Sequence, residues 1–146
     1  MATYNSTAVA LNQPIAFHGE RGVVQFVRQV VTTTAALTTA DVLNFFYLPA
    51  NARIVAAYLV SSDMDTNAAP LLAFNVGDSG AAARLFAASV VGQAGTSSTA
   101  LAQAGLGYIT TAKTLITCSP SASAATGVAG TLELGVSYVA EDSAAS

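Results

Sequence analysis

Short runs of β-branched and aromatic residues recur along the chain, and clusters of Gly, Pro, Asn, Asp and Ser separate them. This spacing is typical of a β-sandwich or barrel, in which each strand is soon followed by a turn. About eight runs are predicted as strands: 23–33, 42–48, 53–62, 71–77, 84–91, 107–111, 114–118 and 128–139. The pattern therefore predicts an all-β fold.

The first and last of these runs differ in how their polar residues are placed. In the run 128–139, apolar side chains from Leu132 to Tyr138 alternate with Thr, Glu, Gly and Ser, so one face is expected in the core and the other in water. In the run 23–33, valines and Phe26 occupy both faces, with Gln25 and Gln29 between them. Because neither face is plainly polar, this strand is expected to be covered on both sides.

The segments between the runs are predicted as turns and loops. Pro49-Ala50-Asn51 favours a tight turn and 63–70 a longer loop. The Ala, Ser and Gly content of 92–105 and 119–127 indicates irregular connections. Helix is the competing prediction for 40–47, but Phe45-Phe46-Tyr47 in succession favours a strand there.

The first 22 residues show no sustained period and contain Pro14 and Gly19, which disfavour a regular core element. We expect residues 1–22 to form an extended N-terminal arm and residues 23–146 to form the sandwich domain. Such an arm commonly becomes ordered on a partner, and the alternative is a frayed terminus. The candidate interface residues are two apolar anchors and three polar neighbours: Ile15, Phe17, His18, Glu20 and Arg21.

Composition narrows the class of protein. At 146 residues the chain fits one domain, and its charged fraction of 9% lies far below the roughly 25% of soluble domains. So little charge, with 53% hydrophobic residues, indicates an exterior that is largely covered by partners in an assembly. Five scattered basic residues against eight acidic ones give no stripe for nucleic acid. The sequence contains no run of about 18 apolar residues, so no membrane-spanning segment is predicted. The N-terminus lacks the pattern of a secretory signal, so assembly in a cytosol is expected.

Gly77-Asp78-Ser79-Gly80 matches the tetrapeptide around the nucleophile of chymotrypsin-like proteases. An activated serine needs a histidine base, and His18, the only histidine, lies in the predicted arm. A hydrolase using Ser79 would need these two residues to meet across the fold. A turn at the end of a strand is the favoured interpretation, so no enzyme activity is predicted.

Two further motifs are interpreted as structural. Asp63-Met64-Asp65 begins like a calcium-binding loop, but Ala68 replaces the turn glycine and Phe74 stands where a bidentate Glu is needed. A polar loop is therefore predicted rather than a metal site. Cys118 is the only cysteine, has no metal-ligand spacing around it, and is predicted to be a small buried residue. No catalytic, metal or cofactor residues are predicted.

Three stretches, 35–59, 74–80 and 105–139, together resemble the small decoration, or cement, proteins of tailed-bacteriophage heads. The shared features are a Leu48-Pro49 turn before a strand that begins at Arg53, the Val76–Gly80 turn, and a closing Ala/Thr/Gly loop before an alternating strand that ends near Tyr138.

The resemblance implies a jelly-roll-like antiparallel β-sandwich on the outer capsid surface of a virion. It implies binding to the outside of a shell of major capsid protein, clamping of neighbouring subunits, and assembly as a homodimer or homotrimer, with no catalytic residues and no cofactor. The alternative function is a binding module for a glycan or host receptor in a head or tail fibre. The absence of Trp and the placement of most Tyr and Phe in predicted strands disfavour that alternative.

Overall fold

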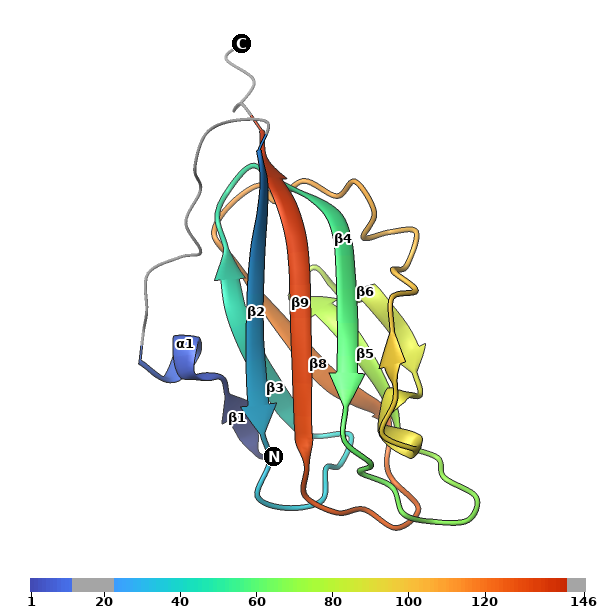
Figure 1. Cartoon of the computed structure of the whole chain (residues 1–146). Helices are drawn as coiled ribbons and strands as arrows, with labels where there is room; N and C mark the ends of the chain where they lie inside the picture. Colours follow the sequence, from blue (N-terminus) through green and yellow to red (C-terminus); the bar gives the residue numbers. More distant parts are fainter. Residues whose placement is uncertain (12–22, 142–146) are drawn as a thin grey trace.

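The structure is a computed structural model, and it describes residues 1–11 and 23–141. Strands dominate these residues (Figure 1). In chain order, the elements are β1 (Thr3–Asn5), α1 (Thr7–Ala10), β2 (Val24–Thr32), β3 (Val42–Leu48), β4 (Ala52–Ser61), β5 (Ala73–Asp78), β6 (Ala81–Ser89), the 3-10 helix η1 (Val91–Gln93), β7 (Ser97–Ser98), β8 (Thr114–Ala122) and β9 (Thr131–Ala140).

The strands form two sheets that pack face to face. Sheet A has the order β1-β3-β8-β5-β6, and sheet B has the order β2-β9-β4-β7. The pairs are antiparallel except β1 with β3, which is parallel. From β2 onward consecutive strands lie in opposite sheets, except β5 and β6, which pair with each other in sheet A (Figure 1). The predicted all-β sandwich is confirmed.

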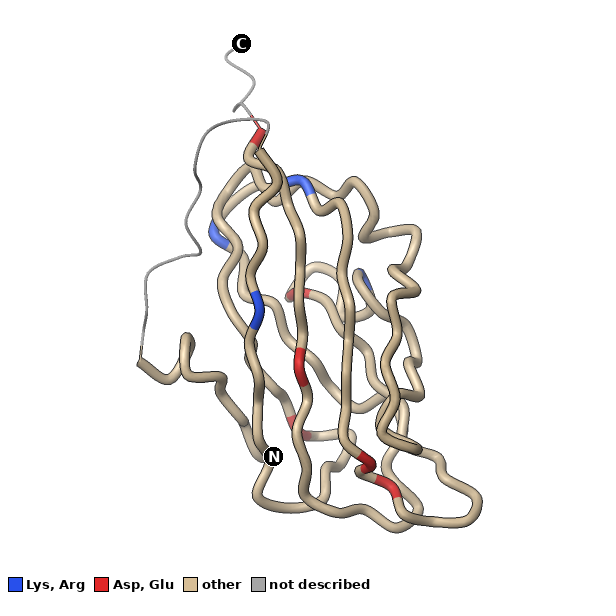
Figure 2. Tube along the Cα trace, in the orientation of Figure 1, with Lys and Arg blue, Asp and Glu red and all other residues tan. Residues whose placement is uncertain are grey.

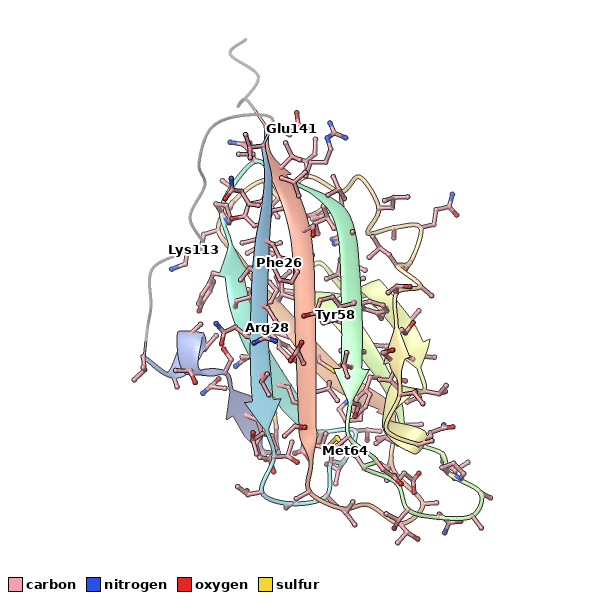
Figure 3. All side chains as sticks on the ribbon, viewed as in Figure 1. Phe26, Arg28, Tyr58, Met64, Lys113 and Glu141 are labelled. Atoms are coloured by element: carbon pink, nitrogen blue, oxygen red, sulfur yellow. The ribbon has the colours of Figure 1, made fainter. Side chains whose placement is uncertain are left out.

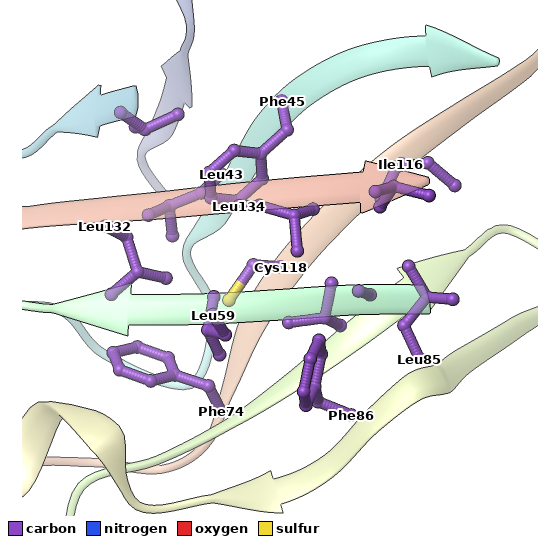
Figure 4. Close-up of a cluster of buried hydrophobic side chains, with 14 of the residues drawn as sticks. Leu43, Phe45, Leu59, Phe74, Leu85, Phe86, Ile116, Cys118, Leu132 and Leu134 are labelled. Carbon is purple, nitrogen blue, oxygen red and sulfur yellow. The ribbon is translucent and has the colours of Figure 1, made fainter. Parts of the chain in front are cut away.

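The core lies between the two sheets and is built from their inward-facing side chains (Figure 4). The predicted alternation of β9 is confirmed, because Leu132, Leu134, Val136 and Tyr138 are all buried. Phe45, Phe74 and Phe86 from sheet A meet them from the other side. Full burial of each such side chain contributes about 1.5–3 kcal/mol, so this layer is the main source of stability.

Several boundaries differ from the sequence-based prediction. The run 107–111 does not form a strand; it crosses the end of β4, where Ile54 N–H donates to the Tyr108 carbonyl and a single bridge joins Arg53 to Ile109. β8 continues through Ala122 into a segment that was predicted as irregular. The short strands β1 and β7 were not predicted, since neither shows an apolar alternation of its own.

The strand predicted over 42–48 is confirmed as β3, and the helical alternative is wrong. The predicted turn that follows is also present, and Asn51 adopts φ +61°, a left-handed conformation that Asn tolerates better than most residues. This turn carries the chain from sheet A to sheet B. It therefore makes a corner of the sandwich rather than a hairpin within one sheet.

The described part of the predicted arm, residues 1–11, packs on β3. The backbone N–H of Ala2 donates to Asp41 Oδ1 at 2.6 Å, and the buried Ser6 hydroxyl donates to the Phe45 carbonyl. The Ser6 side chain also accepts from Val9 N–H and so caps α1. Residues 3–5 thus form the edge strand of sheet A, while the function of an arm over 1–22 stays a prediction.

Candidate interaction surface

The outer face of sheet B carries an apolar surface that the single chain leaves open. Cross-strand register sets Phe26 beside Ser137, Arg28 beside Gly135, and Val30 beside Glu133. β4 continues the last two rows with Tyr58 and Val60. We call this face the outer patch; it consists of Val24, Phe26, Arg28, Val30, Tyr58, Val60, Glu133, Gly135 and Ser137.

Apolar side chains of the outer patch are strongly exposed. The exposed fractions are 59% for Val24, 57% for Phe26, 40% for Val30 and 37% for Val60. The expectation that the first strand is covered on both sides is therefore wrong within one chain. Its inner face packs against the core, where Val31 is buried and Val27 is partly buried, but its outer face is open, so any cover on that side must come from another molecule.

Gly135 creates the space in which the centre of the outer patch is arranged. A Cβ atom at this position would collide with the ring of Tyr58 and lie 3.0 Å from Phe26 Cε2. The Tyr58 ring can therefore lie flat across β9, where it stacks with Phe26 at a centroid distance of 6.0 Å and an interplanar angle of 29°. Figure 3 shows Phe26 and Tyr58 on the same face of the sheet.

Arg28, Tyr58 and Glu133 form the polar centre of the outer patch. The Tyr58 hydroxyl donates to Glu133 Oε1 at 2.7 Å, and Arg28 Nη1 lies 3.4 Å from Glu133 Oε2. Burial, with added help from the bond to Glu133, raises the pKa of Tyr58, so the ring stays a neutral donor. Charged residues are few and dispersed over the described chain (Figure 2), which makes this opposite-charge pair a distinctive feature of the face.

A groove of about 510 Å³ borders the outer patch. Phe26, Ala56 and Tyr58 line it from sheet B, and Leu101 and Leu106 line it from the segment 99–106. Leu106 is itself largely exposed. The groove is thus walled mainly by apolar groups, which suits an apolar side chain better than a strongly polar ligand.

A second groove, of about 620 Å³, lies beside the Gly77–Gly80 motif. Tyr47 and Tyr108 line it, but Lys113 Nζ sits 4.3 Å from the first ring centroid and Arg84 Cζ sits 3.7 Å from the second. Each ring therefore has a cation over one face. Each pair joins a loop residue to a strand, Tyr108 to β6 and Lys113 to β3.

The Gly77–Gly80 motif forms the turn between β5 and β6, as the favoured interpretation predicts. Asp78 accepts from the backbone N–H of Gly80 at 2.7 Å and of Ala81 at 3.0 Å, and it pairs with Arg84. Burial acts to raise the pKa of Asp78, but Arg84 and the two N–H groups outweigh it and lower the pKa. Asp78 is thus fully used in shaping the turn.

Asp65, in the calcium-like sequence, binds backbone rather than presenting free ligands. Its Oδ2 accepts from the N–H groups of Leu71, Leu72 and Ala125, and its Oδ1 accepts from Thr126. Burial acts to raise the pKa of Asp65, but these four bonds outweigh it and hold the pKa well below its ordinary value. The carboxylate joins two loops that lie about 60 residues apart in sequence.

Cys118 is buried in sheet A, and burial raises the pKa of its thiol, so it packs as a small apolar residue as predicted. Across residues 1–11 and 23–141, no three His, Cys, Asp or Glu side chains gather closely enough to hold a metal ion. No helix in the same residues is long and apolar enough to cross a membrane.

The structure cannot be compared with the predicted interface residues, because Ile15, Phe17, His18, Glu20 and Arg21 lie outside the described residues. The sequence-based prediction did not single out Phe26, Tyr58 or the Arg28–Glu133 pair. The sequence did contain one indication of this surface. The first strand has apolar residues on both faces, and a single core can bury only one of them.

The molecule is thus a β-sandwich protein with an exposed apolar face, and two solved structures resemble it over most of its length. A chain of the cyanophage Pam1 capsid asymmetric unit is 39% identical, with a TM-score of 0.76, and the match covers 88% of this chain and 92% of that one. A chain of the capsid of Ralstonia phage GP4 is 28% identical, with a TM-score of 0.81, and the match covers 97% and 99%.

No protein-family model and no curated protein matches the sequence. The identity and coverage of the Pam1 match nevertheless show the family. This chain belongs to a family of bacteriophage capsid-associated proteins, and its role in the virion is structural.

Proposed function

We propose that this chain is a decoration, or cement, protein that binds the outside of a phage capsid and holds neighbouring major capsid protein subunits together. The observation that carries the proposal is the similarity, over nearly the whole chain, to a chain of a phage capsid. The crossing of strands between two four-stranded layers, with β1 added at one edge, supports the jelly-roll-like form of the sandwich.

The physical properties of the chain suit this function. A charge-poor sandwich with an open apolar face gains free energy when another surface covers that face. A protein that contacts two or three shell subunits at once also gains from high effective concentration, by a factor of about 10² to 10⁴ in avidity. Modest individual contacts can therefore hold a shell together, and no enzymatic step is needed.

We place the contact with the shell at residues 15–21. Ile15 and Phe17 would serve as apolar anchors, while His18, Glu20 and Arg21 would form polar contacts at the rim. Both flanks of this stretch are held by the sandwich, since α1 ends at Ala10 and β2 begins at Val24. We further propose that assembly is completed in the host cytoplasm.

The test is addition of the purified protein to expanded capsids that lack it. We expect the protein to occupy regular positions on the outer surface and to raise the temperature at which the particles open. A location in the tail alone, or no change in particle stability at full occupancy, would contradict the proposal.

The double variant Ile15→Ser, Phe17→Ser tests the contact residues in the same assay. Loss of two apolar anchors should weaken capsid binding by roughly tenfold or more. Val90→Ser is the matched control, because Val90 is also an exposed apolar residue but lies outside this stretch. Equal binding of the double variant and the control would remove residues 15–21 from the interface.

A further inference from the structure

We propose that the outer patch is the surface through which two copies of this chain bind face to face, with Arg28 of each copy against Glu133 of the other. The inference takes up the homodimer that the resemblance to decoration proteins implies, and it does not depend on capsid binding. It specifies the partner of the patch and the pairing of its charges.

The outer patch exposes a contiguous group of apolar side chains. Val24, Phe26 and Val30 stand in one row along an edge strand, and Val60 and Leu106 extend the apolar area across the sheet. Contiguous exposed apolar area of this kind marks a contact surface in a soluble protein. The stacked Phe26–Tyr58 pair adds the sort of aromatic anchor that is enriched at the centre of interfaces.

The charges of the patch favour a second copy as the partner. The patch contains one cation, Arg28, and one anion, Glu133, at neighbouring positions on β2 and β9. A surface with both signs side by side is complementary to itself, because a two-fold axis between them places each charge opposite its counterpart. A patch that bound a different, oppositely charged surface would need charges of only one sign, whereas this patch carries both.

The register determines how such an axis must run. Arg28 and Glu133 are one strand and one two-residue row apart, which is about 4.8 Å by about 6.7 Å. An axis in the interface that exchanges these two positions is oblique to the strands, so the strands of the two copies cross at roughly 70°, near the orthogonal class of sheet packing.

This oblique arrangement also matches the apolar positions. The same axis passes within about 1.5 Å of Val30 and of Gly135, so Val30 meets its own equivalent, and the Tyr58 rings that cover Gly135 lie beside the axis. Phe26 then falls over Val60 of the second copy. By contrast, an axis along β9 sets Glu133 against Glu133, and an axis across the strands at Arg28 sets Arg28 against Arg28, which like-charge repulsion disfavours.

The size of the patch sets the expected strength. Three strands of nine or ten residues span about 30 Å by 14 Å. Two such strips that cross at roughly 70° overlap over about 14 Å by 15 Å, which is about a quarter of the roughly 800 Å² per partner of a standard interface, so the dimer is expected to be weak in free solution. On a particle, neighbouring copies would be held at high effective concentration and would pair readily.

The experiment is a charge exchange measured by analytical ultracentrifugation over roughly 1 µM to 1 mM, the range in which a weak dimer forms. Wild type should show a concentration-dependent dimer. Arg28→Glu and Glu133→Arg should each weaken it at least tenfold, because each variant opposes two pairs of like charges. An equimolar mixture of the two variants should restore dimers, since each carboxylate of the first variant then meets a guanidinium of the second.

Lys113→Glu is the control for net charge, because it makes the same charge change on the chain outside the outer patch and should leave the dimer unchanged. Far-ultraviolet circular dichroism should show the same fold for every variant, as Arg28 is mostly exposed. A wild type that stays monomeric to 1 mM, single variants that still dimerise, or a mixture that fails to restore dimers would each overturn the inference.

Capsid addition separates this inference from the proposed function. Arg28→Glu should still bind capsids through residues 15–21, with lower occupancy at limiting protein. If the charge exchange succeeds but no variant or wild type binds capsids, the dimer stands and the cement function fails. If wild type is monomeric and Arg28→Glu alone abolishes capsid binding, the shell rather than a second copy covers the outer patch.

Discussion

The two sheets have similar inner faces and opposite outer faces. On the outside of sheet A, Asn44 pairs with Thr117 and Asn75 pairs with Ser119, so these two rows are polar, while the row of Tyr47 and Leu115 is half-buried. On the outside of sheet B, the equivalent positions of β2 carry Val24, Phe26 and Val30. Water can satisfy the first face, whereas the second leaves apolar area uncovered.

The difference shows how a chain with so little charge divides its exterior. In the two rows that contain Asn44 and Asn75, small polar side chains make sheet A compatible with water without Lys or Glu. On sheet B, the outer patch exposes apolar side chains instead. The pairing of β2 with β9 runs in one register from Val24 to Thr32, so the apolar surface lies on a well-formed part of the sheet and points to contact with another molecule.

The largest expected effect comes from the inner face that the two sheets share. Leu134→Ala should lower the free energy of unfolding by about 2–5 kcal/mol, because Leu134 is 0% exposed and its removal leaves a cavity. Ser137→Ala, on the outer side of the same strand, should change it by less than about 0.5 kcal/mol. Urea unfolding of both variants at low protein concentration measures the contrast. Similar losses would mean that β9 is not divided into a core face and an outer face.

Alternation predicted β9 well because every inward residue of that strand meets one core. The same signal failed at β1 and β7, which are short edge strands held by pairing with distant parts of the chain rather than by their own pattern. The run 107–111 was overestimated because Tyr108 and Ile109 look strand-like, although they only bridge the end of β4. Local pattern describes burial, and it does not identify the neighbour.

The candidate surface was predicted only in part for the same reason. The apolar outer side of β2 was visible in the sequence, and cover on both sides was the natural expectation for a single sheet strand. The link between Arg28, Tyr58 and Glu133 was hidden, since it depends on the register of three strands that lie up to 105 residues apart. Gly135 gave no sign of its role until Tyr58 was placed over it.

A smaller effect on stability, with a larger one on association, is expected from Gly135→Ala. The new methyl group must displace the Tyr58 ring, which breaks the bond to Glu133 and costs about 1 kcal/mol in unfolding free energy. Dimer formation should fall more strongly, because the ring no longer lies flat in the outer patch. Tyr58→Phe separates the two effects, as it removes the hydroxyl while keeping the ring in place. If Gly135→Ala associates as well as wild type, the flat placement of the Tyr58 ring is unimportant for association.

A small effect on the stability of the single chain is expected from Arg28→Met, and its size sharpens the contrast between the two sheets. The Arg28 side chain is 57% exposed and lies 3.4 Å from the Glu133 carboxylate, so its loss should cost about 0–1 kcal/mol in unfolding free energy.

Arg84, on β6 of sheet A, is the comparison. Its side chain is only 15% exposed, pairs with Asp78 at 2.5 Å and covers the Tyr108 ring. Arg84→Met leaves a buried carboxylate with fewer partners and should cost about 1–3 kcal/mol. Both variants are measured by urea unfolding of dilute protein, where copies do not meet. A larger loss of unfolding free energy for Arg28→Met than for Arg84→Met would show that the Arg28–Glu133 pair stabilises the single chain. It would then contradict the interpretation of the outer patch as a surface that binds a partner.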